Sequence, residues 1–121
     1  ENSIITNAEL AGIKNLDYRG WKTEVIDITL DISPDSTENL EQRLDIICQQ
    51  AEQAIANKSS LIVLSDRASN QNRAAISSLM ACGAVHHHLV NVAQRTQIGI
   101  VVETGEAREV HHFCTLFGYG A

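Results

Sequence analysis

Two short polar segments hold the charged side chains that are best placed to do chemistry in this sequence. Each segment directly follows an apolar run, and their charged residues are Asp66, Arg67, Glu103, Glu106 and Arg108. A carboxylate at the end of a buried strand can serve as a general acid or base, which makes Asp66 and Glu103 candidate catalytic groups. The same charges can instead form ion pairs that hold loops together or dock them on another domain. The residue types and their spacing leave both interpretations open.

The apolar runs before these charges indicate two strands of a parallel sheet. Leu61–Leu64 and Ile98–Val102 are short and almost wholly apolar, and each is followed by a polar tip and a segment of helical character. Uninterrupted apolar strands that alternate with helices are typical of a parallel sheet buried on both faces. Such sheets gather functional groups at the carboxyl ends of their strands. We therefore expect the two strands to be parallel neighbours, with both polar tips at the same edge.

The remaining elements follow from apolar periodicity. Alternation over residues 23–30 predicts a strand with one buried face, at the edge of the sheet. The helix predicted over 38–57 has the clearest apolar stripe, in which Leu44 and Ile47 are expected to face the sheet. The other predicted helices cover residues 7–16, 73–92 and 106–117. The sum is an α/β fold of parallel strand–helix repeats, which we expect to form part of a TIM-barrel-like array.

Consecutive histidines at His86–His88, and a second pair at His111 and His112, suggest a metal site. Successive residues of a helix point about 100° apart, so three adjacent histidines cannot hold one ion from one helix. A structural zinc site also needs four converging ligands. We therefore expect packed histidines that hydrogen-bond to their surroundings, and no bound metal.

Glycine and serine near the strand ends raise two further possibilities. Gly99 and Gly105 could allow a phosphate to approach the backbone, but the glycine-rich fingerprint of phosphate-binding loops is missing. Ser65 follows a strand, but it has neither the flanking glycines of a nucleophile elbow nor a neighbouring histidine. We therefore expect neither a phosphate site nor a serine nucleophile.

Composition limits the partners that this chain can bind. The 121 residues are 44% hydrophobic and 20% charged, with a net charge of −6 and no cluster of Lys and Arg. This argues against nucleic acid and anionic membranes, both of which attract basic surfaces. No apolar run approaches the length of a membrane helix, and we expect no signal peptide. Cys48, Cys82 and Cys114 are far apart, and we predict reduced, buried thiols of a cytosolic-type compartment.

Several short motifs occur in a fixed order through the second half of the chain. They are Leu64–Arg67, Gly83–Leu89, Val101–Arg108, His111–Phe113 and Gly118–Ala121. In this order they resemble the central domain of the glutamate synthase large subunit. The resemblance implies that residues 1–121 form one partial domain, cut at both ends, of a larger enzyme. It also implies a linking domain without a reaction of its own, in which Asp66, Arg67, Glu103 and Arg108 form a structural or domain-docking network.

The resemblance carries further expectations about the parent enzyme. In that family the central domain lies between a glutamine amidotransferase domain and an FMN-binding synthase domain. The parent makes two glutamates from glutamine and 2-oxoglutarate, and its FMN and 3Fe-4S cluster lie outside this chain. The sequence of Val101–Arg108 favours ferredoxin over NADPH as the electron donor of the parent. The resemblance implies that the parent works in the cytoplasm or the plastid stroma. Two alternatives stay open: a small barrel-type enzyme that uses Asp66 and Glu103, and a stand-alone binding module.

Overall fold

The computed structural model of this chain describes residues 4–5, 22–92, 98–105 and 109–116. Side chains are described for residues 22–91 and 98–105. The predicted helix over 7–16 lies outside the described residues, as do Glu106 and Arg108.

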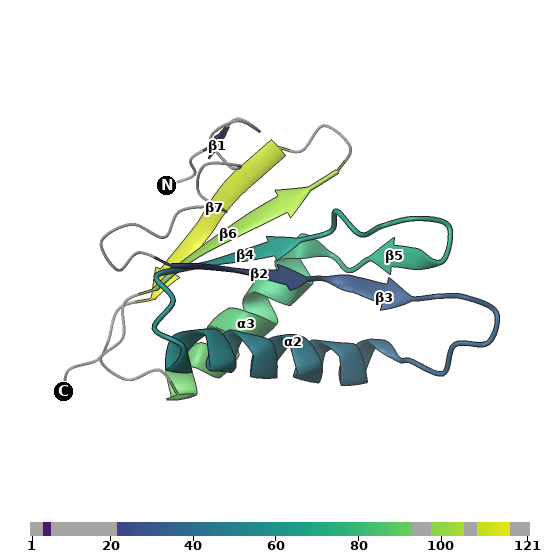
Figure 1. Ribbon diagram of the computed structural model, residues 1–121, viewed down its shortest axis with the longest axis horizontal. Coiled ribbons are helices and arrows are strands. Elements are labelled where there is room, and N and C mark those ends of the chain that lie inside the picture. The colour runs from purple at the N-terminus through teal and green to yellow at the C-terminus, as the bar shows by residue number, and fades with distance from the viewer. Residues whose placement is uncertain (1–3, 6–21, 93–97, 106–108, 117–121) are drawn as a thin grey trace.

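Five strands form one mixed sheet, in the order β1-β7-β6-β4-β2 (Figure 1). The two apolar runs become β4 (Leu61–Ser65) and β6 (Ile98–Thr104), which are adjacent and parallel, as predicted. β2 (Thr23–Asp27) runs parallel to β4 and ends the sheet on one side, which confirms the predicted edge strand among the described residues. On the other side lie two antiparallel strands, β7 (Glu109–Leu116) and β1 (Ile4–Ile5).

Both described helices cover the same face of this sheet (Figure 1). α2 (Leu40–Ala56) is the helix predicted over 38–57, and the side chains of Asn39 and Gln42 form a capping box at its start. As predicted, Ile47 is buried, and Leu44 packs half-buried against the same core. α3 (Ser78–Val92) lies beside α2. Apolar side chains of the two helices and the three parallel strands form one continuous core, which excludes water from this face.

The opposite face of the sheet carries the candidate site. Val63 and Val101 are buried there in a second, smaller apolar cluster with Leu61. Alternate residues of a strand point to the same face, so Ser65 and Glu103, two positions further on, share this face with the two valines. The apolar middle of the sheet therefore leads directly into the polar strand ends.

The helix predicted over 106–117 is wrong, because residues 109–116 form the antiparallel strand β7. Val110, Phe113 and Thr115 have β-branched or aromatic side chains, which favour strands. The pairing register with β6 skips Phe113, so the strand contains a β-bulge. A bulge shifts the alternation of apolar and polar residues by one position. With this shift, the spacing of apolar residues in this stretch resembles that of a helix, which explains the wrong prediction.

The helix predicted over 73–92 begins later, at Ser78, because residues before it form a strand. β5 (Arg73–Ala75) pairs antiparallel with β3 (Thr29–Asp31) in a separate two-stranded sheet. Ser77 ends this extended stretch, since its carbonyl accepts from Ala81 N–H at 2.9 Å and its hydroxyl from Met80 N–H at 3.3 Å. The predicted strand over 23–30 is likewise divided between the two sheets.

The described sheet is open, and it does not close into a barrel. Three strands, β2, β4 and β6, are parallel, and this part agrees with the predicted strand–helix repeats. The prediction that the whole array is parallel is wrong, because β7 lies antiparallel beside β6. A short connection suffices for antiparallel neighbours, whereas parallel neighbours need a crossover of a dozen or more residues.

Candidate functional site

The candidate site lies where β2, β4 and β6 end side by side. Asp27, Ser65 and Glu103 are successive partners in the backbone register of these three strands. Asp66 and Arg67 follow Ser65 directly, at the start of a turn. The parallel sheet therefore brings together four of the residues that the sequence had singled out or considered: Ser65, Asp66, Arg67 and Glu103.

Glu103 supplies a fully enclosed carboxylate at the centre of this site, with no exposed surface. Ser65 Oγ donates to Glu103 Oε1 at 2.6 Å. Arg67 Nε donates to Glu103 Oε2 at 3.1 Å, and Arg67 Nη2 donates to the same oxygen. Burial of a carboxylate is costly unless it is both paired and hydrogen-bonded. Glu103 therefore acts here as a fixed acceptor that orients Ser65 and Arg67.

Asp66 joins the tips of the two central strands. Its N–H donates to the carbonyl of Glu103 at 3.2 Å, and its Oδ2 accepts from Gly105 N–H at 3.1 Å. The hydroxyl of Ser69 donates to the Asp66 carbonyl at 2.6 Å, which holds the turn after β4. Gly105 has a φ of 78°, in the left-handed region that favours glycine. Asp66 thus fixes the turn after β6, which Gly105 makes sterically possible.

Arg67 is the member of this site that faces outward. Its side chain is 55% exposed, whereas Asp66 and Ser65 are buried. An open pocket of about 220 Å³ lies beside it, lined by Val25, Asp27, Ser65, Arg67 and Ala68. A general acid or base must reach the proton that it transfers, and Glu103 is enclosed. The exposed guanidinium can instead bind a carboxylate or a carbonyl oxygen of a partner, so the geometry suits positioning better than proton transfer.

A second arginine–carboxylate cluster consists of Asp27, Thr29, Arg43 and Arg73, and we call it the β2–β3 junction. Arg43 donates to the carbonyls of Asp27 and Thr29 at 2.7 and 2.9 Å. Arg73 Nε donates to Thr29 Oγ1 at 2.7 Å, and that hydroxyl donates to Asp27 Oδ1 at 2.7 Å. Both guanidinium groups also lie near Asp27 Oδ2, at 3.7 and 3.8 Å. The cluster fastens the point where the chain leaves the main sheet for the small one.

The β2–β3 junction could not be recognised from the sequence. Its arginines come from α2 and β5, and most of their acceptors are main-chain oxygens. Main-chain acceptors leave no trace in residue types. Residue types gave no usable signal, because Arg43 lies on a helix with many exposed polar positions and its 11% exposure is visible only in the structure.

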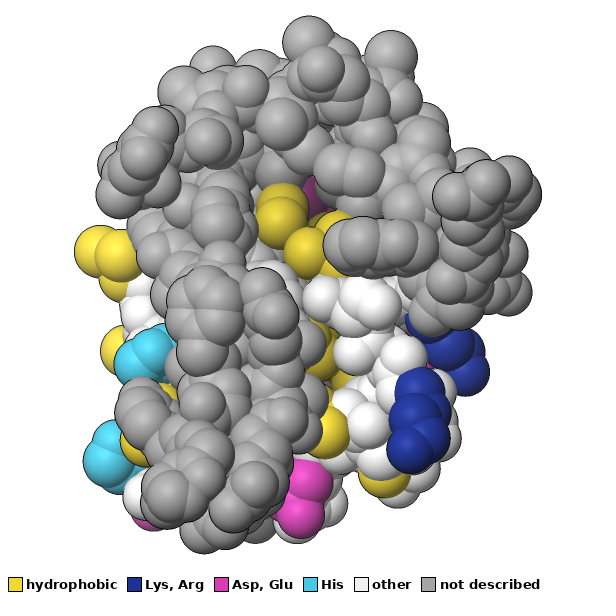
Figure 2. Space-filling view, turned by 90° about the vertical axis from the view of Figure 1, so that its left-hand side faces the viewer, with side chains coloured by type: hydrophobic (Ala, Val, Ile, Leu, Met, Phe, Trp, Pro, Cys, Tyr) yellow, Lys and Arg dark blue, Asp and Glu magenta, His cyan; other side chains and the backbone are white. Residues whose placement is uncertain are grey.

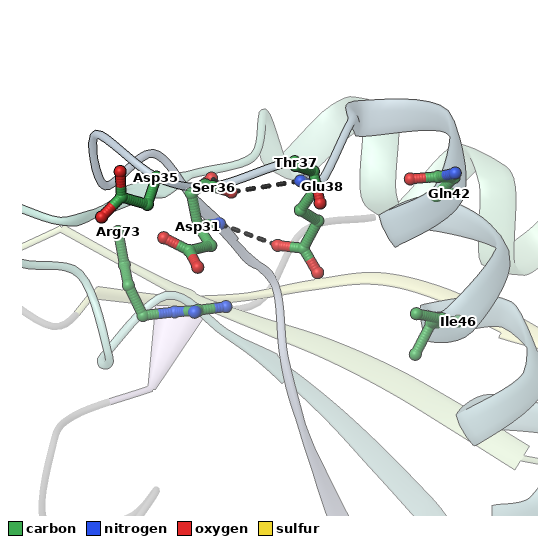
Figure 3. A pocket seen from close by; sticks show the side chains of 8 residues that line it. All are labelled: Asp31, Asp35, Ser36, Thr37, Glu38, Gln42, Ile46 and Arg73. Atoms are coloured by element: carbon green, nitrogen blue, oxygen red, sulfur yellow. Dashed lines mark hydrogen bonds between the residues drawn. The ribbon is translucent and has the colours of Figure 1, made fainter.

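An open pocket of about 510 Å³ lies between the β3–α2 loop and α2 (Figure 3). Its lining comprises Asp31, Asp35, Ser36, Thr37, Glu38, Gln42, Ile46 and Arg73. Asp31 Oδ1 accepts from the N–H and the hydroxyl of Ser33, and Asp31 N–H donates to Glu38 Oε1 at 2.8 Å. The Ser33 N–H and then the Ser33 hydroxyl hold the pKa of Asp31 below its ordinary value. These two carboxylates therefore organise the loop.

Comparison with known proteins decides the family. A model of the glutamate synthase central domain matches residues 1–121. The chain belongs to the glutamate synthase central domain family. It is 43% identical to the NADH glutamate synthase of Schizosaccharomyces pombe over 120 residues, 98% of this chain and 6% of that protein.

Relatives that are named for other electron donors are also similar to this central domain. The NADPH glutamate synthase large chain of Bacillus subtilis is 39% identical over 118 residues, 98% of this chain and 7% of the relative. The chloroplastic ferredoxin-dependent glutamate synthase of Spinacia oleracea is 40% identical over 102 residues, 83% of this chain and 6% of the relative. The chain thus spans only a small part of the length of these curated relatives.

One histidine of this central domain links the two described helices. His88 Nε2 lies 2.9 Å from Glu52 Oε1, which links α3 to α2. Among the described residues, no group of three or more His, Cys, Asp or Glu could hold a metal ion. His111 and His112 fall on β7, where side chains are outside the description. Within the described part of the chain, neither helix is long and apolar enough to cross a membrane.

Two cysteines of this central domain are described, and both are free thiols. Cys82 is buried and Cys48 is half-buried, in partial agreement with the prediction, while Cys114 has no described side chain. Burial, and then the nearby charge of Asp45, raises the pKa of the Cys48 thiol. A raised pKa keeps this thiol protonated and unreactive at neutral pH.

The two glycines of β6 and its tip have local explanations. A Cβ at Gly99 would lie 3.0 Å from the end of the Leu61 side chain, so the neighbouring strand disfavours a larger residue there. Gly105 is required by its positive φ. Neither position needs a bound phosphate to account for it.

Proposed function

We propose that this chain is the non-catalytic linking domain of a glutamate synthase. The parent enzyme would make two glutamates from glutamine and 2-oxoglutarate. Its flanking partners in the same chain would be a glutamine amidotransferase domain, which releases ammonia, and an FMN-binding synthase domain, which uses it. The domain would help to couple the two reactions. The names of the relatives, and the 6–7% of their length that this chain spans, support the proposal.

The observation that carries the proposal is the enclosure of Glu103 beside an exposed Arg67. Both carboxylate oxygens of Glu103 are held by protein donors, and no part of the residue meets solvent. Such a carboxylate is built to hold an arginine in place. The strand-end network of Asp66, Arg67 and Glu103 would then present a fixed guanidinium to a flanking domain. Arg108, predicted as the fourth member, lies outside the described residues.

The parent cofactors and surroundings belong to the same proposal. FMN and a 3Fe-4S cluster would be bound by other parts of the parent, and none by this chain. Relatives of the NADH, NADPH and ferredoxin types are 43%, 39% and 40% identical to this chain, so overall identity does not distinguish the electron donor. Ferredoxin is therefore proposed from the sequence of Val101–Arg108 alone. The enzyme would work in the cytoplasm or the plastid stroma.

A barrel-like array can extend this domain only on one side. β2 is the outermost of the described strands on its side of the sheet, and a further parallel strand of the parent could lie beside it. On the other side the antiparallel β7 occupies the place that a parallel barrel strand would take. The partial TIM-barrel-like fold is therefore proposed for the β2 side alone.

The decisive experiment separates coupling from chemistry in the full-length parent. Asp66→Asn and Glu103→Gln should leave glutamine hydrolysis, with the synthase site primed, and glutamate formation from added ammonia nearly intact. The coupled reaction should fall, because the two active domains lose their register. Asp45→Asn is the matched control: it removes the charge of an exposed carboxylate on α2, away from the strand ends, and it should leave all three rates unchanged.

The alternatives predict different results. If Asp66 or Glu103 is a general acid or base, its removal should slow one half-reaction by about 10²- to 10⁴-fold in a variant that still folds and binds FMN. That outcome would replace the linking role by strand-end catalysis in a barrel-type enzyme. A stand-alone binding module is tested by the parent gene, since its reading frame would then not continue into a flavin-binding domain.

A further inference from the structure

The two described helices differ sharply in charge. α2 carries Glu41, Arg43, Asp45 and Glu52 along its 17 residues, whereas the 15 residues of α3 include no Asp, Glu, Lys or Arg. A surface helix ordinarily carries charged or polar residues on the side that faces solvent, and α3 has no Asp, Glu, Lys or Arg there. α3 nevertheless buries only one side, through residues such as Val85 and Leu89. Its other side is open in the described structure.

The open side of α3 has a regular shape. Leu79, Gly83, His87 and Asn91 are all exposed and follow one another at intervals of four, so they form a single ridge along the helix. Leu79 is 70% exposed, and its neighbour Met80 is 45% exposed. Figure 2 shows histidine side chains beside exposed hydrophobic side chains at the left edge of the view, and Lys and Arg at the right. Among the residues with described side chains, the histidines all belong to α3.

Gly83 has no function within the described chain that would explain it. A Cβ at this position would meet nothing within 4 Å. Glycine inside a helix costs about 1 kcal/mol relative to alanine. A glycine in the middle of an exposed ridge allows another backbone to come close, because it leaves a gap between the side chains on either side. A packed helix from outside would make use of both the gap and the flanking Leu79.

We infer that the ridge Leu79–Gly83–His87 of α3 packs against an uncharged, apolar helix of the parent polypeptide, outside residues 1–121. The curated relatives are single chains of which this domain spans only 6–7%, so neighbouring segments of the same chain are tethered close to it. The ridge has no Asp, Glu, Lys or Arg, so we expect its partner to be held by packing rather than by ion pairs with such residues. The inference rests on the proposed linking role and adds the surface by which the domain is held.

The test measures accessibility in the full-length parent. Leu79→Cys introduces a thiol smaller than the side chain it replaces, so it cannot push the contact apart. Gln50→Cys, at an exposed position of α2, is the control. With a maleimide reagent and peptide mass spectrometry, the thiol at position 79 should react about 100-fold more slowly than the thiol at position 50, since reaction would require local opening. Both should react equally fast after denaturation.

Gly83→Cys provides a second position on the same ridge, and amide exchange of α3 in the unmodified parent provides a measurement without substitution. Equal reactivity at positions 79 and 50, together with fast exchange on the open side of α3, would overturn the inference. Protection that disappears on dilution to single chains would assign the surface to a second copy and also overturn it. These outcomes are independent of the half-reaction assays, so the linking role and this contact can fail separately.

Discussion

The two arginine–carboxylate clusters at the carboxyl end of the sheet are built in opposite ways. In the strand-end network the side chain of Glu103 is enclosed, and the side chain of Arg67 is 55% exposed. In the β2–β3 junction the side chain of Asp27 is 40% exposed, and the side chain of Arg43 is only 11% exposed. The first cluster therefore presents a cation to the outside, whereas the second encloses its cation among main-chain oxygens.

This difference indicates different tasks. The enclosed arginine of the junction is occupied by the carbonyls of Asp27 and Thr29, so it has little left to offer a partner. The exposed arginine of the strand-end network is held by a fixed carboxylate, and part of its guanidinium remains open to solvent. The junction fastens the domain internally. The strand-end network combines internal fastening with a surface that another domain can bind.

The largest expected effect comes from Arg67→Met in the full-length parent. The substitution leaves the enclosed carboxylate of Glu103 without its guanidinium, and we expect a local loss of about 2–3 kcal/mol around β4 and β6. At 1.4 kcal/mol per factor of ten, amide exchange in these strands should quicken about 30- to 150-fold. Arg67→Lys, which keeps the charge but not the fork of donors, should lose less. Unchanged exchange in Arg67→Met would show that Glu103 does not depend on Arg67.

A smaller effect is expected for Thr29→Val at the junction. The valine keeps the shape of a fully buried side chain but removes the hydroxyl that donates to Asp27 and accepts from Arg73. We expect a loss of about 1–2 kcal/mol, because both partners keep other contacts or reach solvent. Amide exchange of β3 and β5 should report it. A loss larger than that of Arg67→Met would reverse the order of the two clusters.

The sequence predicted the strand-end network because its members are adjacent to recognisable strands. Unbroken apolar runs located β4 and β6, and parallel pairing then brought Asp66 and Glu103 to one edge. The same reasoning could not find Arg43, whose acceptors are main-chain oxygens of a chain segment 14 and 16 residues away. It also failed for β7, since the bulge at Phe113 disturbed the alternation that identifies strands. Local periodicity is visible in sequence, whereas main-chain partners and bulges depend on tertiary pairing.

A still smaller effect is expected for Arg73→Gln. Arg73 is partly exposed, and its distance to Asp27 Oδ2 is 3.8 Å, so solvent screens the pair. We expect a loss of about 0.5–1 kcal/mol, mainly from the hydrogen bond to Thr29 Oγ1. The loss should change little between low and high salt, as measured by exchange of β3 amides. A strong salt dependence would instead mean that the ion pair with Asp27 dominates.

The smallest effect concerns the pKa of Asp31, which lies beside the junction. Its lowered pKa arises first from the Ser33 N–H, then from the Ser33 hydroxyl, and last from the charge of Arg73. Because the folded pKa is depressed, the stabilisation is present above the unfolded pKa and is lost as the pH falls through the folded pKa. The 31–38 loop should therefore lose amide protection at acidic pH, after correction for intrinsic exchange. Ser33→Ala should move this midpoint upward, since it removes the hydroxyl but keeps the N–H. Arg73→Gln should move it less, and a larger shift in Arg73→Gln than in Ser33→Ala would show that the junction charge, rather than the loop, controls Asp31.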